Sequence, residues 1–134
     1  MGAKATTRPR GERNIISFVA EGGALVEKYG VMRGTADYQA KVPTGADVLV
    51  LGIVDEGGGA AAVGDPVAVV QGGETIAISG QASLGTNVPV SIDADGKVVS
   101  AAAGDHNVVG ITRSSADAED DEVLVFVNIQ PKRS

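Results

Sequence analysis

The chain has 134 residues, a formal net charge of −6 and 43% hydrophobic residues, but only 3% aromatic residues and neither tryptophan nor cysteine. This length suits one domain. The absence of cysteine excludes disulfides and cysteine-ligated metals, and no apolar run reaches the roughly 18 residues of a membrane span. We therefore expect a single domain with a core of Val, Ile, Leu and Ala, and no membrane partner.

The charges divide the chain into a basic arm and an acidic body. Residues 1–13 carry four bases and one acid, a balance of +3, whereas residues 14–131 carry 5 bases and 16 acids, a balance of −11. An acidic body repels nucleic acid, so none is expected as a partner. A basic arm can bind an acidic surface, although a solvated tail is the alternative. The residues predicted to bind a partner are Lys4, Arg8, Arg10 and Arg13. The expected division is arm 1–13, single β domain 14–130 and tail 131–134.

The first half of the body contains four β-rich or ambiguous segments. NIISFVA (14–20) reads as a strand, and ALVEKYGVMRG (24–34) fits a short strand or one helical turn. DVLVLGIV (47–54) is almost continuously apolar, which is typical of a strand buried on both faces. DPVAVV (65–70) opens on Pro66, which suits the first residue of a strand. The small residues of Gly57–Ala62 are expected to form an exposed loop.

The second half continues the same pattern. ETIAISGQA (74–82) alternates apolar and polar residues, and VPVSI (88–92) and KVVSA (97–101) flank a hairpin turn in which Gly96 takes positive φ. NVVGIT (107–112) and DEVLVFVNI (121–129) are the last strands. Short strands about ten residues apart predict an all-β fold. We expect a compact β-barrel or β-sandwich of short antiparallel strands with an extended basic N-terminal arm.

One unit occurs twice in the body. LGIVDEGGGAAAVGDPVAVV (51–70) and VGITRSSADAEDDEVLVFV (109–127) both open on an apolar residue followed by Gly-Ile and end in Asp-x-Val-x-Val. AAVGD (61–65) also recurs as AAAGD (101–105), where Gly and Asp suit equivalent tight corners. The repeat carries almost no reactive side chain, so we interpret it as scaffold. Because 47–54 and 121–129 are apolar on both faces, a second sheet or a neighbouring copy should cover them.

No motif predicts catalysis or a cofactor. EGGGAAAVGD (56–65) lacks the Gly-Lys-Ser/Thr of a phosphate-binding loop, and DADG (93–96) lacks the remaining ligands of a calcium loop. DAEDDE (117–122) reads as a solvated acidic loop. His106 could pair with Asp105, but no nucleophile accompanies them, so a turn residue is the better interpretation. We expect neither enzymatic activity nor a cofactor or metal.

The order of motifs resembles the small head decoration, or cement, proteins of tailed bacteriophages. The resemblance spans roughly residues 14–129 and rests on FVAEGGALVEKYG, LGIVDEG…VGDPVAVVQGG, GQASLGTNVPVSIDADGKVVSAAAGDHNVVGIT and DEVLVFV. It implies a compact β-barrel or β-sandwich that binds the outer surface of an icosahedral head, with the major capsid protein as partner and a homotrimer as its form. It also implies a structural virion protein that stabilises the capsid.

Two alternatives stay open. Lys97 near a hairpin tip is similar to the modified lysine of biotinyl and lipoyl carrier domains, although Gly96 and Val98 are not the flanks of those domains. A small β-barrel binding or carrier module is therefore the alternative function. An enzyme with an unrecognised site is the other.

Overall fold

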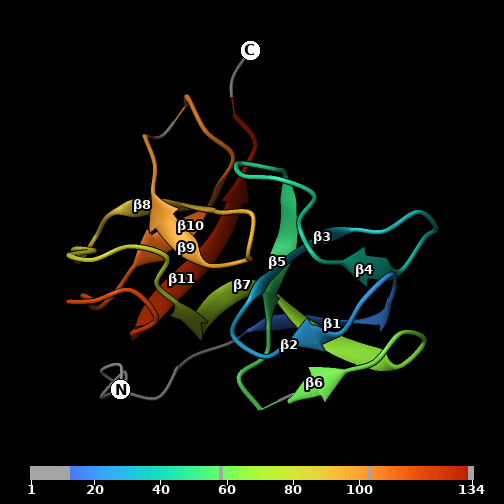
Figure 1. Cartoon of the computed structure of the whole chain (residues 1–134). Helices are drawn as coiled ribbons and strands as arrows, with labels where there is room; N and C mark the ends of the chain where they lie inside the picture. Colours follow the sequence, from blue (N-terminus) through green and yellow to red (C-terminus); the bar gives the residue numbers. More distant parts are fainter. Residues whose placement is uncertain (1–12, 58, 103, 133–134) are drawn as a thin grey trace.

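The computed structural model describes residues 13–57, 59–102 and 104–132, and over these ranges it contains eleven β-strands and no helix (Figure 1). No helix there has the length and apolar character to cross a membrane. The strands are β1 (Asn14–Ala20), β2 (Leu25–Val26), β3 (Gly30–Arg33), β4 (Gln39–Lys41), β5 (Val50–Val54), β6 (Ala60–Ala61), β7 (Pro66–Ile78), β8 (Pro89–Ile92), β9 (Val98–Ser100), β10 (Val108–Thr112) and β11 (Glu122–Gln130).

Five strands close into a first barrel, in the order β1-β4-β3-β5-β7, and the pairing of β7 with β1 completes the ring. Only the β1–β4 pairing is parallel; the others are antiparallel. The short β2–β6 ribbon lies beside this barrel, which forms the right-hand lobe of Figure 1. Of the two predicted architectures, the barrel is confirmed.

A second barrel follows in the order β7-β11-β10-β8-β9. It closes where Ser79, one residue beyond β7, forms a parallel bridge with Val98 of β9. The N–H of Gly80 donates to the carbonyl of Val98 at 2.8 Å and supports this closure. The strands of this barrel form the left-hand lobe of Figure 1.

The long strand β7 belongs to both barrels. Its first part pairs with β1 and its second part with β11, and the partners change at Gly72, which faces Asn14 on one side and Asn128 on the other. A break was expected between 65–70 and 74–82, and that prediction is wrong. The ladder continues through Gly72 and Gly73 because a new partner strand takes over where the first one ends.

The two barrels repeat the same hairpin in the same register. Ile53 of β5 pairs with Val70 of β7, and the corresponding pair in the second barrel is Ile111 of β10 with Phe126 of β11. The sequence repeat 51–70 and 109–127 is therefore a structural repeat of two paired strands.

The repeat extends further than the sequence motifs indicated. In the first barrel Ala20 pairs in parallel with Ala40, and in the second Ser79 pairs in parallel with Val98. Aligned on these pairings, β1, β3, β4, β5 and the first part of β7 correspond to the second part of β7, β8, β9, β10 and β11. The chain is one five-stranded barrel built twice.

A shared glycine explains why Gly-Ile recurs. A Cβ added to Gly52 would lie 2.1 Å from the carbonyl oxygen of Val70, and a Cβ on Gly110 would lie 2.1 Å from that of Phe126. Both strands approach a partner backbone so closely that no side chain fits there. The same backbone contact therefore fixes glycine in both copies of the unit.

Each barrel has its own core, and the second core extends onto the first barrel. The first cluster contains Phe18 and Leu25, and the second contains Leu84, at the position that corresponds to Leu25. The second cluster also includes Val50, Ile53 and Val70, from the outer face of the first barrel. The apolar strand predicted at 47–54 is thus covered on its second face by the other barrel of the same chain.

Two local predictions need correction or completion. Segment 24–34 holds two short strands rather than a helical turn, and the supposed loop Gly57–Ala62 contains β6, in which Ala61 is buried. Pairing with β2 explains this, because Leu25 opposite Ala61 is fully buried. Strand β4 was not predicted, since a three-residue strand carries too little pattern.

Candidate functional site

Surfaces rather than a reactive centre define the candidate sites. In the described ranges no three His, Asp or Glu side chains gather in a way that could hold a metal ion. Arg13, Lys97 and His106 each contact a carboxylate of the chain, whereas Lys4, Arg8 and Arg10 lie outside those ranges.

Lys97 is held by two carboxylates of the acidic loop. Its Nζ lies 2.7 Å from Oδ1 of Asp120 and 3.3 Å from Oε2 of Glu119, and only 15% of its side chain is exposed. The hydrogen bond to Asp120 raises the pKa of Lys97 above its ordinary value, and that to Glu119 adds to the rise. A carrier lysine needs a free, flexible amine, so this geometry does not favour the carrier alternative.

His106 pairs with Asp47, not with its neighbour Asp105. Nδ1 of His106 lies 3.1 Å from Oδ2 of Asp47, and the N–H of Asn107 donates to Oδ1 of Asp47 at 2.8 Å. Asp47 belongs to the loop before β5 and the other two residues precede β10, so the contact joins the two barrels. The sequence favoured a plain turn residue over an Asp105 pair, and it did not indicate this contact with Asp47 of the first barrel.

The acidic loop Asp117–Glu122 is partly buried, contrary to expectation. Asp121 is 3% exposed, and its Oδ2 accepts hydrogen bonds from the N–H groups of Asp117 and Ala118 at 3.1 and 3.0 Å. It closes the turn before β11. Hydrogen bonds satisfy this carboxylate, so an acid can be buried in a loop that its composition predicts to be solvated.

Asp65 closes the corresponding turn of the first barrel. Its Oδ2 accepts from the N–H of Ala62 at 3.2 Å, as Asp121 accepts from Ala118. Gly64 has φ of 89° in this turn, and Asp120 has φ of 73° in the other. The predicted role of Asp as a turn cap is confirmed for Asp65.

Arg13 contacts its own chain. Its Nη1 lies 3.1 Å from Oδ1 of Asp55 and 3.3 Å from Oε2 of Glu56, both in the loop after β5. Lys4, Arg8 and Arg10 lie outside the described residues. The prediction that the arm binds a partner therefore stays a prediction.

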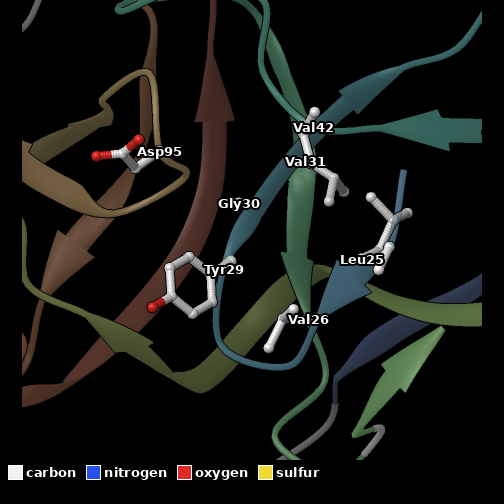
Figure 2. Close-up of a pocket in the computed structure, with 8 residues that line it drawn as sticks. Leu25, Val26, Tyr29, Gly30, Val31, Val42 and Asp95 are labelled. Atoms are coloured by element: carbon white, nitrogen blue, oxygen red, sulfur yellow. The ribbon is translucent and has the colours of Figure 1, made fainter. Parts of the chain in front are cut away.

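One hollow lies at the junction of the two barrels. It measures about 140 Å³ and has mainly apolar walls, including Leu25, Val31 and Val42 from the first barrel. Figure 2 shows Asp95, on the β8–β9 turn, on the opposite side of Tyr29 from these residues. Small-molecule pockets usually measure about 300–1,000 Å³. We interpret this hollow as incomplete packing between the barrels.

A second hollow is the open end of the first barrel, which we call the barrel mouth. It measures about 280 Å³. Its lining residues are Phe18, Arg33, Asp37, Tyr38, Gln39 and Leu51. The ring of Tyr38 lies 6.3 Å from that of Phe18, and Tyr38 is 70% exposed. Sequence reasoning missed this site, because its residues come from four strands and the β3–β4 loop.

An exposed apolar pair lies on the second barrel. Ile111 and Phe126, paired across β10 and β11, are each 37% exposed. The guanidinium of Arg113 lies 5.1 Å from the centre of the Phe126 ring. We call this pair the knob. Exposed aromatic and aliphatic side chains rimmed by charge are typical of protein contact sites.

These features define an all-β scaffold of two fused barrels with apolar contact surfaces. Among solved structures, the chain is similar to the head fiber gp8.5 N base of bacteriophage phi29, with a TM-score of 0.63 and 12% identity over 87% of this chain and 95% of that chain. At this identity the likeness shows a shared fold. No protein-family model matches the chain, and no curated protein matches it in sequence.

Proposed function

We propose that this chain is a structural virion protein that binds the outer surface of an icosahedral phage head and stabilises the capsid. Its partner is the major capsid protein, and its assembled form is a homotrimer. The observation that carries the proposal is the fold shared with a phage head fiber base over 95% of that chain. The motif order resembling head decoration proteins supports it independently.

The physical properties of the chain suit this role. The two barrels share strand β7 and one apolar cluster, an architecture that needs no catalytic group, and the chain acts as no enzyme in this proposal. Several linked copies make weak contacts sufficient, because the second and third contacts become effectively intramolecular. Arg13, bound to Asp55 and Glu56, ties the end of the arm to the first barrel. In this proposal Lys4, Arg8 and Arg10 supply the capsid contacts.

The test is co-sedimentation with expanded empty heads assembled from the major capsid protein encoded in the same genome. The full chain should sediment with the heads in a fixed ratio and raise their resistance to heat. A variant with Lys4, Arg8 and Arg10 changed to Ser should keep its fold and lose binding to the heads. Binding of the full chain should weaken as the salt concentration rises, because salt screens the charges of the arm.

The matched control changes Thr6 and Thr7 to Ala in the same arm, which leaves its charge unchanged. This control should bind as the full chain does. Heads that never retain the full chain would refute capsid binding, whereas full binding by the Ser variant would refute only the role of the arm. Mass spectrometry of the chain made in its natural host should show Lys97 unmodified.

A further inference from the structure

The contact between the two barrels shows how this unit packs against its own repeat. Ala77, Ile92 and Val109 stand at the register positions of the second barrel that match the lining of the barrel mouth in the first. All three belong to one buried cluster that also includes Ile53 and Val70 from the outer face of the first barrel. At this contact the outer face of the first barrel covers the mouth of the second barrel.

Backbone contacts show how close this packing is. A Cβ added to Gly30 of the first barrel would lie 2.6 Å from Cδ1 of Ile92, so the Ile92 side chain occupies that space. The N–H of Gly30 also donates to the carbonyl of Gly96 at 2.7 Å. The β8–β9 turn is therefore seated directly on the first barrel.

Within the described ranges, one copy of each surface stays open. By the strand register, Phe18, Arg33 and Leu51 of the open barrel mouth correspond to Ala77, Ile92 and Val109 of the covered one. Ile111 and Phe126 of the knob correspond to Ile53 and Val70. Ile53 and Val70 are 0% exposed, whereas both members of the knob are 37% exposed.

We propose that copies of this chain join head to tail, with the knob of one copy filling the barrel mouth of the next. The contact repeats between chains the packing that already exists within one chain. Both surfaces also carry charged side chains: Arg113 lies beside the knob, and in the mouth Asp37 pairs with Arg33 at 3.1 Å. Such a heterologous contact builds a ring if the rotation closes and a filament if it does not.

This inference names the surfaces of the self-association in the proposed function, but it does not depend on capsid binding. Three copies joined in this way would form the homotrimer, with every knob and every mouth occupied. A solution assay without heads tests the contact, so its failure is distinguishable from failure to bind a capsid.

The experiment uses two singly blocked variants in sedimentation velocity over a range of protein concentrations. Phe126→Asp blocks the knob, and Tyr38→Asp blocks the mouth at a residue whose φ of 60° Asp tolerates. Each should weaken self-association about tenfold or more, because it places a charge in an apolar contact. Val63→Asp, at a 61% exposed position outside both surfaces, is the matched control and should associate normally.

Mixing the two blocked variants is the decisive measurement. The mouth of the Phe126→Asp copy and the knob of the Tyr38→Asp copy are both intact, so the mixture should form a dimer and nothing larger. A mixture that stays monomeric overturns the proposal, as does a wild-type chain that is monomeric at every concentration.

Cross-linking keeps the proposal testable if a blocked variant folds poorly. The natural chain contains no cysteine. Arg113→Cys mixed with Asp37→Cys should give a disulfide-linked heterodimer on oxidation. Cross-linking of either variant with itself at the same rate would indicate a two-fold contact and overturn the head-to-tail arrangement.

Discussion

In the first barrel, Ile53 and Val70 on the outer face are completely buried, whereas Ile111 and Phe126 at the corresponding positions of the second barrel are each 37% exposed. The strand register is the same in both barrels, so the backbone does not cause the difference. The cause is a neighbour, since the second barrel covers these residues of the first, whereas no segment within 13–57, 59–102 or 104–132 buries Ile111 and Phe126. The burial of these outer-face residues therefore depends on what packs against the outside of each barrel.

The interiors of the barrels also differ. In the second barrel Thr112 and Ser79 are fully buried where the first has Val54 and Ala20. Their hydroxyls donate to loop carbonyls, from Thr112 to Gly85 at 2.6 Å and from Ser79 to Gln81 at 2.6 Å. The first barrel is held by apolar packing alone at these positions, and the second also ties its loops to its strands. Three predictions use such corresponding pairs, and a fourth compares two lysines.

The largest effect is expected at the shared glycine. Gly52→Ala and Gly110→Ala each place a Cβ against a partner carbonyl oxygen, 2.1 Å away in both cases. Backbone cannot yield as a side chain does, so each change should lower the free energy of unfolding by about 3 kcal/mol or more. Urea denaturation followed by circular dichroism measures this.

Gly57→Ala is the control for this pair, because a Cβ there meets nothing within 4 Å. If the two barrels are true repeats, the two strand variants should be equally damaging. A mild effect at either site would show that one of the contacts relaxes and that the repeat is only approximate there.

The turn aspartates should be unequal. Asp121 is buried and accepts two backbone hydrogen bonds, whereas Asp65 is exposed and accepts one. Asp121→Ala leaves two donors without a partner and should cost about 2–3 kcal/mol, against about 0.5–1 kcal/mol for Asp65→Ala. Equal losses of stability in thermal melts would contradict the assigned difference in burial.

A smaller effect is expected where Asp47 of the first barrel contacts His106 and Asn107 of the second. Asp47→Ala removes the acceptor of the Asn107 N–H and the partner of His106, and should cost about 1–2 kcal/mol. Asp105 occupies the corresponding position in the second barrel and is exposed, so Asp105→Ala should change stability by less than about 0.5 kcal/mol. A large effect at Asp105, or none at Asp47, would show that the Asp47 contact does not stabilise the junction of the two barrels.

Sequence patterns predicted the strands that carry the cores. The Gly-Ile and Asp-x-Val-x-Val motifs identified β5, β10 and β11, because close approach and alternating burial fix those residues. They did not show that two barrels form. The closing strand β4 has only three residues, and β7 reads as two strands because Gly72 and Gly73 resemble a break. Only the partner strands make it continuous.

The contact surfaces were less predictable than the fold. Phe18, Tyr38 and Leu51 lie far apart in the sequence, and only closure of the barrel brings them to one mouth. The repeat cannot be recognised from the residues at the mouth, since Arg33 corresponds to Ile92 and Tyr38 to Gly96. Surfaces that face different neighbours diverge in composition even where the backbone repeats.

The smallest effect concerns two lysines that both pair with carboxylates. Lys28 Nζ lies 2.6 Å from Oε2 of Glu122 and links the two barrels, whereas Lys97 pairs with Glu119 and Asp120 within the second barrel. The hydrogen bond to Glu122 raises the pKa of Lys28 above its ordinary value of 10.5. A lysine whose pKa is raised by folding adds stability below the unfolded pKa and loses it as pH rises through the folded pKa.

Lys28→Gln should therefore lower the free energy of unfolding by about 0.5–1 kcal/mol at neutral pH, a modest figure because the pair is partly exposed. The difference in free energy of unfolding between this variant and the natural chain should stay constant from neutral pH to about pH 10. It should then narrow at more alkaline pH as the natural lysine loses its proton. Lys28→Arg, which keeps the charge, should show no gap at neutral pH. Urea titrations at stepped pH measure both. A gap that widens with pH would mean that Glu122 is not what stabilises Lys28, and that the barrels are joined at this point by packing alone.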